Sequence, residues 1–128
     1  MSEIKFRGWD KKENRMREIV LIDLRNRQVL VETDESEECD LLDFCEVELM
    51  QFTGLRDKNG REIYEGDIVR GAGIKPKVYV VGWLDTYGGF AFLDDEKAIP
   101  AYEFLNDFCE VIGNIYENPE LLREADAE

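Results

Sequence analysis

The chain has 128 residues with 30 acidic against 16 basic side chains, and its formal net charge of -14 disfavours general binding to nucleic acids and acidic membranes. It contains no histidine, which excludes histidine-dependent triads and the usual zinc hydrolases, and leaves carboxylate chemistry with or without Mg²⁺ and thiol or lysine nucleophiles in unusual surroundings. Its length predicts one domain with one core, and the lack of a signal-peptide pattern or of an apolar run of roughly 20 residues predicts a soluble cytoplasmic protein.

The first part of the chain predicts three strands joined by polar turns. Residues 4–9 alternate apolar and basic side chains with the period of two of a half-buried strand, and residues 10–14 form a polar turn. Residues 16–24 are rich in Ile, Val and Leu, which favours a second strand. The basic turn at residues 25–27 separates it from a third β-prone segment, residues 28–31.

An acidic segment follows at residues 32–40. It carries six carboxylates in nine positions and hardly any apolar side chain. Such a segment cannot gain enough burial to offset the entropy lost on ordering. We therefore expect a mobile acidic loop near residues 32–40.

The stretch QFTGLRDKNGREIYEGDIV, residues 51–69, contains two glycine corners. Asn59 and Gly60 favour a type I′ turn, which predicts the tip of a hairpin. Gly66 predicts a second bend, after which another strand begins. Corners this close together are typical of the rims of small curled sheets and barrels. We expect positive φ at both glycines and a loss of more than about 1 kcal/mol for Gly66→Val.

The last part of the chain predicts further strands and one helix. Residues 77–84 and 90–93 form the aromatic-rich arms of a hairpin, whereas residues 98–107 fit either a loop or one helical turn. Residues 108–116 predict the last strand, and the cap, proline and carboxylate at residues 118–120 begin a short helix. The predicted fold is mainly β, with a small curled or barrel-like (SH3-like) antiparallel sheet and a short C-terminal helix, in a single domain over residues 1–128.

The cysteines and one short repeat have simple interpretations. Cys39, Cys45 and Cys109 are odd in number and lack C-x-x-C spacing, which predicts reduced thiols rather than a disulfide framework or a zinc ribbon. The pentapeptide DFCEV occurs at residues 43–47 and 107–111. Either the copies are equivalent strands of a duplicated unit or they converged on similar sheet positions, and the lack of a fixed repeat period favours convergence.

Several polar and aromatic side chains are candidates for a site. Carboxylates that could bind Mg²⁺ form two groups, Glu62, Glu65 and Asp67, and Asp94, Asp95 and Glu96. Acidic residues beside glycine corners more often cap turns through backbone amides, and we favour that interpretation. Three aromatic residues could stack on bases or sugars, although strand aromatics are more often core: Trp9, Trp83 and Tyr87. We expect hydrogen bonds from Gln51 and Thr53 to fix the corner at Gly54.

Three blocks of the sequence together resemble the YopX family of phage and prophage proteins. The blocks are IKFRGWD followed by Met16, LMQFTGLRDKNGREIYEGDIV, and VIGNIYENPELL. The middle block departs from the family's usual residues at Phe52, where tyrosine is common, and at Arg56 and Arg61, where lysine is common. The resemblance implies a phage or prophage origin and a compact, mostly-β fold, and it implies no particular activity. The acidic loop and residues 70–108 lie outside these blocks, so partner choice can be set there.

Taken together, these features predict a non-enzymatic interaction protein without cofactor, metal or catalytic residue. Its acidic surface would bind a host or phage protein with a basic surface, as a nucleic-acid mimic does. The candidate partner contacts are Glu35, Glu37, Glu38, Trp83 and Tyr87. Three alternatives stay open. The acidic surface serves solubility alone, or the chain is a nucleic-acid-binding module, which would need a local basic patch, or it is a Mg²⁺ enzyme, which would need several carboxylates converging in one pocket.

Overall fold

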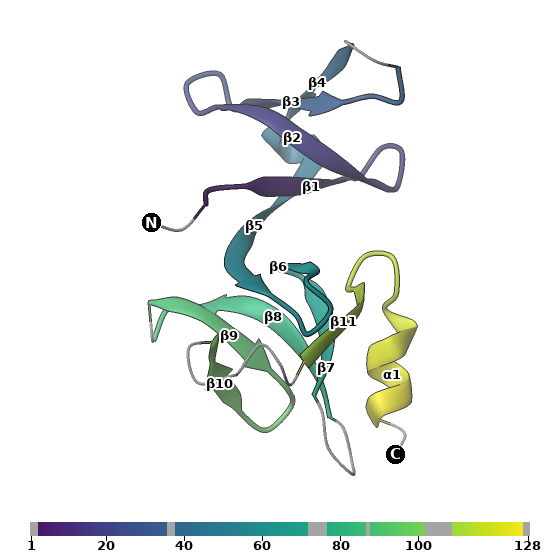
Figure 1. Ribbon diagram of the computed structural model, residues 1–128. Helices are drawn as coiled ribbons and strands as arrows, with labels where there is room; N and C mark the ends of the chain where they lie inside the picture. The colour runs from purple at the N-terminus through teal and green to yellow at the C-terminus, as the bar shows by residue number, and fades with distance from the viewer. Residues whose placement is uncertain (1–2, 36–37, 72–76, 87, 102–108, 127–128) are drawn as a thin grey trace. The chain divides into compact units, whose positions relative to one another are not determined.

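The computed structural model describes residues 3–35, 38–71, 77–86, 88–101 and 109–126. The chain is mainly β, with antiparallel strands and one short helix, as predicted (Figure 1). It divides into two compact units, an N-terminal unit Glu3–Gln51 and a C-terminal unit that begins at Phe52. Two separate clusters of buried apolar residues replace the single core expected from the length.

The N-terminal unit is a five-stranded antiparallel sheet in which the last strand pairs with the first. The sheet order is β4-β3-β2-β1-β5, and a 3-10 turn, η1, leads from β4 into β5. The predicted first three strands and both turns between them are confirmed. The elements are β1 (Phe6–Asp10), β2 (Arg15–Asp23), β3 (Gln28–Glu32), β4 (Cys39–Asp43), η1 (Phe44–Glu46) and the first half of β5 (Val47–Arg56).

Strand alternation builds the core of this unit. Val29 and Val31 of β3 are fully buried beside Leu42 and Val47, while the residues between them face outward. Gly8 allows β1 to approach closely, because a Cβ atom there would lie 2.6 Å from Cγ2 of Val47. The apolar inward side chains of β2, β3, β4 and β5 thus pack into one cluster.

A β-bulge in β2 changes this alternation. Ile19 pairs with Val31 and Leu21 pairs with Leu30, so Val20 is the extra residue between two pairings. Ile19 packs against the core, whereas Val20 and Leu21 are 52% and 50% exposed. The bulge thus places two consecutive apolar side chains on the outside of the sheet.

The loop in the acidic segment is shorter than predicted. Glu32 ends β3, while Cys39 and Asp40 begin β4 and pair with Glu32 and Val31. Backbone pairing orders these ends, although their side chains are exposed and polar. In the connection, the Thr33 hydroxyl accepts a hydrogen bond from the amide of Glu35 at 3.2 Å. Mobility of the loop stays a prediction, and residues 36–37 lie outside the described part of the chain.

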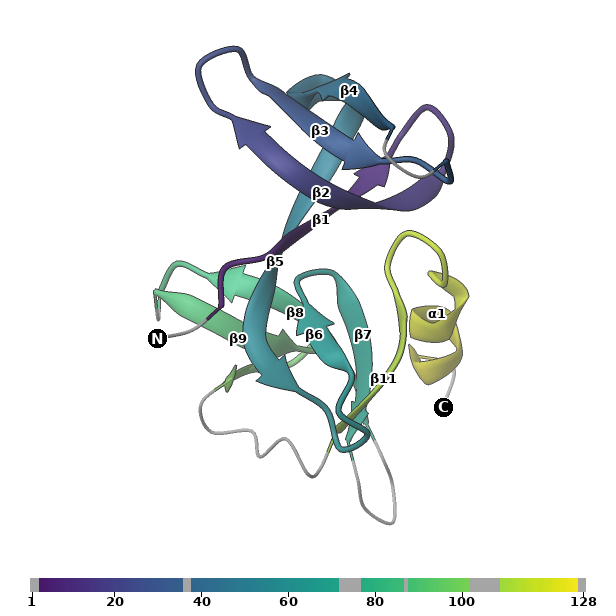
Figure 2. The ribbon, with the colours of Figure 1, turned by 45° about the horizontal axis from the view of Figure 1, so that its top comes forward.

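The C-terminal unit contains the second antiparallel sheet, of order β10-β9-β8-β7-β11 (Figure 2). The second half of β5 pairs with β6, and α1 lies beside β11 in both ribbon views. Its core holds Ile63, Val69, Val81, Phe92 and Val111. The elements are β6 (Glu62–Tyr64), β7 (Asp67–Gly71), β8 (Val78–Leu84), β9 (Gly89–Leu93), β10 (Ala98–Pro100), β11 (Cys109–Asn114) and α1 (Glu120–Asp126).

The predicted strands of this unit and the short helix are confirmed, with one addition. Ala98–Pro100, left unassigned from the sequence, pairs with β9 as strand β10. Both sheets are open in their described pairings, so the predicted barrel closure is wrong. The physical reason is that the long strand β5 pairs with β1 over its first half and with β6 over its second. Likeness to SH3 domains in particular stays a prediction.

The hairpin tip after β5 differs from the predicted turn type. Gly60 and Gly66 both have φ of 82°, as expected, but Asn59 does not have positive φ. The amide of Gly60 donates to the carbonyl of Asp57 at 2.9 Å, as in a type I turn followed by a left-handed glycine. A type I′ turn is excluded because it needs positive φ at both central residues.

The two DFCEV copies occupy different structures. In the first copy Cys45 lies in η1 and is exposed, whereas Cys109 of the second copy is buried in β11. The copies are therefore not equivalent strands, and of their described residues only the last, Val47 and Val111, are both buried in strands. Asp107 and Phe108 lie outside the described residues. Within the described part of the chain, no helix is long and apolar enough to cross a membrane.

A matched pair of glycine substitutions tests the left-handed turn. An added Cβ meets nothing within 4 Å at either Gly60 or Gly89, and Gly60 alone has positive φ. We expect Gly60→Ala to lower the free energy of unfolding by about 1 kcal/mol, because an alanine is strained there. Gly89→Ala should leave stability unchanged or slightly raised. Urea denaturation followed by circular dichroism measures both, and equal effects would contradict the assignment.

Candidate functional site

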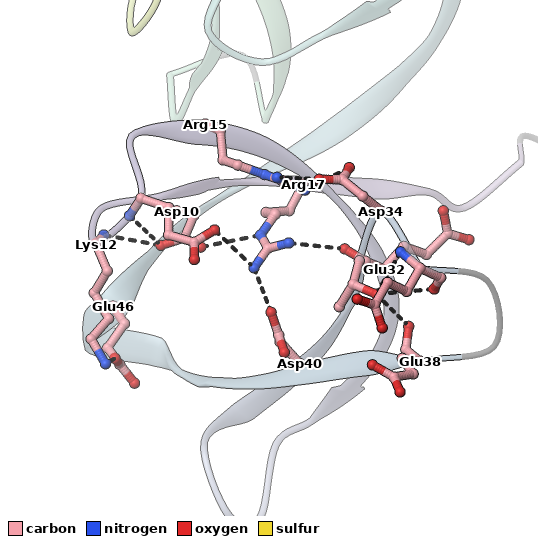
Figure 3. Close-up of polar contacts among 12 residues, drawn as sticks. Asp10, Lys12, Arg15, Arg17, Glu32, Asp34, Glu38, Asp40 and Glu46 are labelled. Carbon is pink, nitrogen blue, oxygen red and sulfur yellow. Dashed lines mark hydrogen bonds and ion pairs between the residues drawn. The ribbon is translucent and has the colours of Figure 1, made fainter.

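A buried arginine in the N-terminal unit binds acceptors at the ends of β1 and β3 and at the start of β4 (Figure 3). The side chain of Arg17 in β2 is 3% exposed. Its Nε donates to Oδ2 of Asp10 at 3.1 Å, its Nη2 to Oδ2 of Asp40 at 2.7 Å, and its Nη1 to the carbonyl of Glu32 at 3.1 Å. One guanidinium thereby joins the ends of β1 and β3 to the start of β4.

Asp10, the last residue of β1, completes this network. Its Oδ1 accepts hydrogen bonds from the amides of Lys12 at 2.9 Å and Glu13 at 3.2 Å. Burial alone raises the pKa of the Asp10 carboxyl, but these hydrogen bonds and the pairing with Arg17 outweigh burial and lower the pKa below its ordinary value. Asp10 is thus a structural carboxylate that stays charged.

Other basic side chains of this unit also lie against carboxylates. Arg15 contacts Asp34 at 2.9 Å, and this pairing lowers the pKa of Asp34. The further ion pairs are Lys5–Glu3 at 3.4 Å, Lys11–Glu48 at 2.9 Å and Lys12–Glu46 at 2.8 Å. These cations are neutralised within the unit.

Some exposed carboxylates lack such a partner. Glu18, Glu32, Glu35 and Glu38 are exposed, and their side chains form no ion pair or hydrogen bond with another described residue. Glu35 and Glu38 were predicted as partner contacts, and the structure places both in the connection between β3 and β4. Glu37 lies outside the described residues.

Two of the aromatic candidates, Trp9 and Trp83, lie in different units of the chain. Trp83 of β8 belongs to the C-terminal unit, is 49% exposed and makes an edge contact with Phe90 at 5.2 Å between ring centroids. Trp9 lies in β1 of the N-terminal unit and is partly buried. Tyr87 lies outside the described residues.

The carboxylates near glycine corners cap turns. Oδ2 of buried Asp67 accepts from the amide of Tyr64 at 2.8 Å, and Oδ1 of Asp94 accepts from the amides of Glu96 and Lys97, both at 2.8 Å. Glu62 lies 3.5 Å from Arg56. Among the described residues no three acidic or cysteine side chains gather as a possible metal site. The turn-cap interpretation is confirmed for Asp67 and Asp94.

The corner at Gly54 is held as predicted for Thr53. Its hydroxyl donates to the carbonyl of Ile63 at 2.7 Å and accepts from the amide of Leu55 at 3.1 Å. Gly54 between them has φ of 86°. The threonine therefore links β5 to β6 across the bend.

Sequence reasoning missed the role of Asp57 at the hairpin tip. Its Oδ1 accepts from the amides of Asn59 and Arg61, each at 2.9 Å, and its Oδ2 accepts from the buried amide of Val111 at 2.9 Å. Burial raises the pKa of Asp57, but these three hydrogen bonds outweigh it and lower the pKa. An aspartate two residues before Asn-Gly was the only sequence signal, and it could not reveal the contact with β11.

Beside this carboxylate, Cys109 is a poor nucleophile. Burial, together with the negative charge of Asp57, raises the pKa of the Cys109 thiol to about 11. The thiolate is the reactive form, so this side chain packs as a small apolar residue.

Replacing Arg17 tests whether the network stabilises the N-terminal unit. We expect Arg17→Met to cost about 3 kcal/mol or more, because it leaves the buried Asp10 without its cation. Arg15→Met, whose partner Asp34 is exposed, should have a much smaller effect. Urea denaturation followed by Trp9 fluorescence in a Trp83→Phe background reports on this unit. A similar midpoint for both variants would contradict the assignment.

Asp57 should contribute acid-sensitive stability to the C-terminal unit. Because folding lowers its pKa, the contribution is complete above the ordinary value of 3.8 and is lost as the pH falls through the native pKa. Asp57→Asn should lower stability near pH 7 and reduce the loss on acidification. Asp94→Asn, a cap in a more exposed turn, is the matched control. The prediction fails if both variants keep the wild-type dependence of unfolding midpoint on pH.

Comparison with known proteins agrees with this architecture. The chain matches a family model described as YopX protein over residues 5–123. It is also similar to the crystal structure of protein EF1440 from Enterococcus faecalis, with 31% identity and a TM-score of 0.67 over 95% of this chain and 99% of that one. No curated protein matches the sequence. Because the family model spans nearly the whole chain, across both units, the chain belongs to the YopX family.

Proposed function

We propose that this protein is a non-enzymatic interaction protein of phage or prophage origin that acts in the cytoplasm of the bacterial host. It binds a host or phage protein with a basic surface through its acidic surface. Nucleic-acid mimicry is one form that such binding takes.

The unequal pairing of charges in the N-terminal unit carries the proposal. Ion pairs at 2.7–3.5 Å hold most of its lysines and arginines, whereas Glu35 and Glu38 remain exposed without a described partner. Arg17 fixes the start of β4, and Thr33 and the Arg15–Asp34 pair anchor the connection that bears these glutamates. The exposed glutamates of this connection, on a chain of net charge -14, attract basic surfaces over distances of about 10 Å at 0.1 M salt.

The salt dependence of association tests this proposal. A partner isolated by pull-down from infected host cells should associate far more slowly at 1 M than at 0.1 M salt, because the Debye length falls from about 10 Å to about 3 Å. The triple variant Glu35→Gln, Glu37→Gln and Glu38→Gln should slow association at low salt.

A control of equal charge change separates location from total charge. Asp95→Asn, Glu96→Gln and Glu120→Gln neutralise three exposed carboxylates of the C-terminal unit. This variant should associate faster than the N-terminal triple variant. A rate that is insensitive to salt and to both triple variants would remove the recognition role.

A further inference from the structure

The outer face of β2, β3 and β4 carries an apolar row that the core does not use. Leu21 pairs with Leu30, and Leu30 pairs with Leu41, so the three side chains lie side by side across three strands. We name them the leucine row. Leu21 is 50% exposed, Leu41 is 56% exposed and Leu30 between them is partly buried.

The bulge in β2 enlarges this patch. It places Val20, 52% exposed, beside Leu21 on the outside, while Ile19 and Ile22 both pack against the core. With regular alternation, only one of the neighbours Val20 and Leu21 would face outward. An exposed apolar group spread over neighbouring strands marks an interaction surface more strongly than scattered single residues do.

Carboxylates flank the leucine row on both sides along the strands. Glu18 and Glu32 lie on one side of the row. Their neighbours Arg17 and Val31 are buried, so alternation places both glutamates on the outer face. On the other side lie Asp23 and Asp43, both paired with Gln28, which donates to Oδ1 of Asp43 at 3.0 Å.

The charges decide which occupant fits. None of the outward positions of β2, β3 and β4 carries a lysine or arginine. The cations Arg25 and Arg27 lie outside these strands, in the turn between β2 and β3. A second copy placed on this face would bring like carboxylates together, which is unfavourable. A segment with apolar side chains flanked by lysine or arginine would bury the leucine row and neutralise the carboxylates on both of its sides.

We propose that the leucine row and its carboxylates dock a basic amphipathic segment of another protein. This inference rests on the proposed function and narrows it, because it locates the contact and adds an apolar requirement to the charge requirement. The glutamates of the β3–β4 connection then guide the approach, and the outer face holds the bound segment.

A titration with designed peptides tests this inference on the full chain. The probe is an 18-residue helical peptide with leucines on one face and lysines on the other. Two comparison peptides replace all leucines by serine or all lysines by glutamate. Amide chemical shifts in ¹H–¹⁵N correlation spectra at low salt report the site and the dissociation constant.

We expect the leucine–lysine peptide to shift the amides of Leu21, Leu30 and Leu41, and to bind about tenfold or more tightly than the serine–lysine peptide. The double variant Leu21→Ser, Leu41→Ser should bind both basic peptides equally weakly. Ile4→Ser, which alters an apolar residue 78% exposed outside this face, should bind as wild type. The spectra also show whether each variant is folded.

The remaining outcomes separate the two proposals. Equal binding of both basic peptides, shifts centred elsewhere, or an unaffected double variant would overturn the docking face and leave charge-driven binding intact. Failure of both basic peptides to bind would overturn both proposals. Equal binding of the leucine–glutamate peptide would exclude a basic partner. Shifts of the same amides on raising protein concentration alone would assign the face to a second copy instead.

Discussion

The ion pair between Arg17 and Asp10 is the constraint on which the N-terminal unit depends. A buried guanidinium has a large desolvation cost, so it is tolerated only where several acceptors surround it. Here the acceptors come from three strands: Asp10 in β1, the carbonyl of Glu32 in β3, and Asp40 in β4. The acidic end of the unit is consequently organised by a cation from within.

Buried Asp57 plays a comparable part in the C-terminal unit, with a different donor set. Backbone amides surround its carboxylate in place of a guanidinium, and one of them belongs to β11, far away in the sequence. In both units a charged side chain fixes a turn beside a strand end while the apolar cluster supplies the burial. Acidic residues in this protein therefore serve two purposes, since a few are internal anchors and many face solvent.

Period-two alternation and turn residues were enough to predict most strands, the two glycine corners and the helix start. They could not predict that β5 would pair with β1 over its first half and with β6 over its second, because alternation in residues 47–56 says nothing about which strands pair with it. The bulge at Val20 was also hidden, since "IVLI" is apolar at every position. The roles of Arg17 and Asp57 depend on contacts distant in sequence, which a single sequence does not display.

The pairing of first and last strands has a consequence for the order of folding during synthesis. The N-terminal unit is complete once Gln51 has been made, because its closing strand pairs with β1. The C-terminal sheet needs β11 to pair with β7, as in Val111 with Val69, so it must wait until β11 has been synthesised. Long-range pairings of this kind form slowly and leave strand edges open meanwhile. A ribosome-bound intermediate with a folded N-terminal unit and an open β7 edge is the expected state of the growing chain.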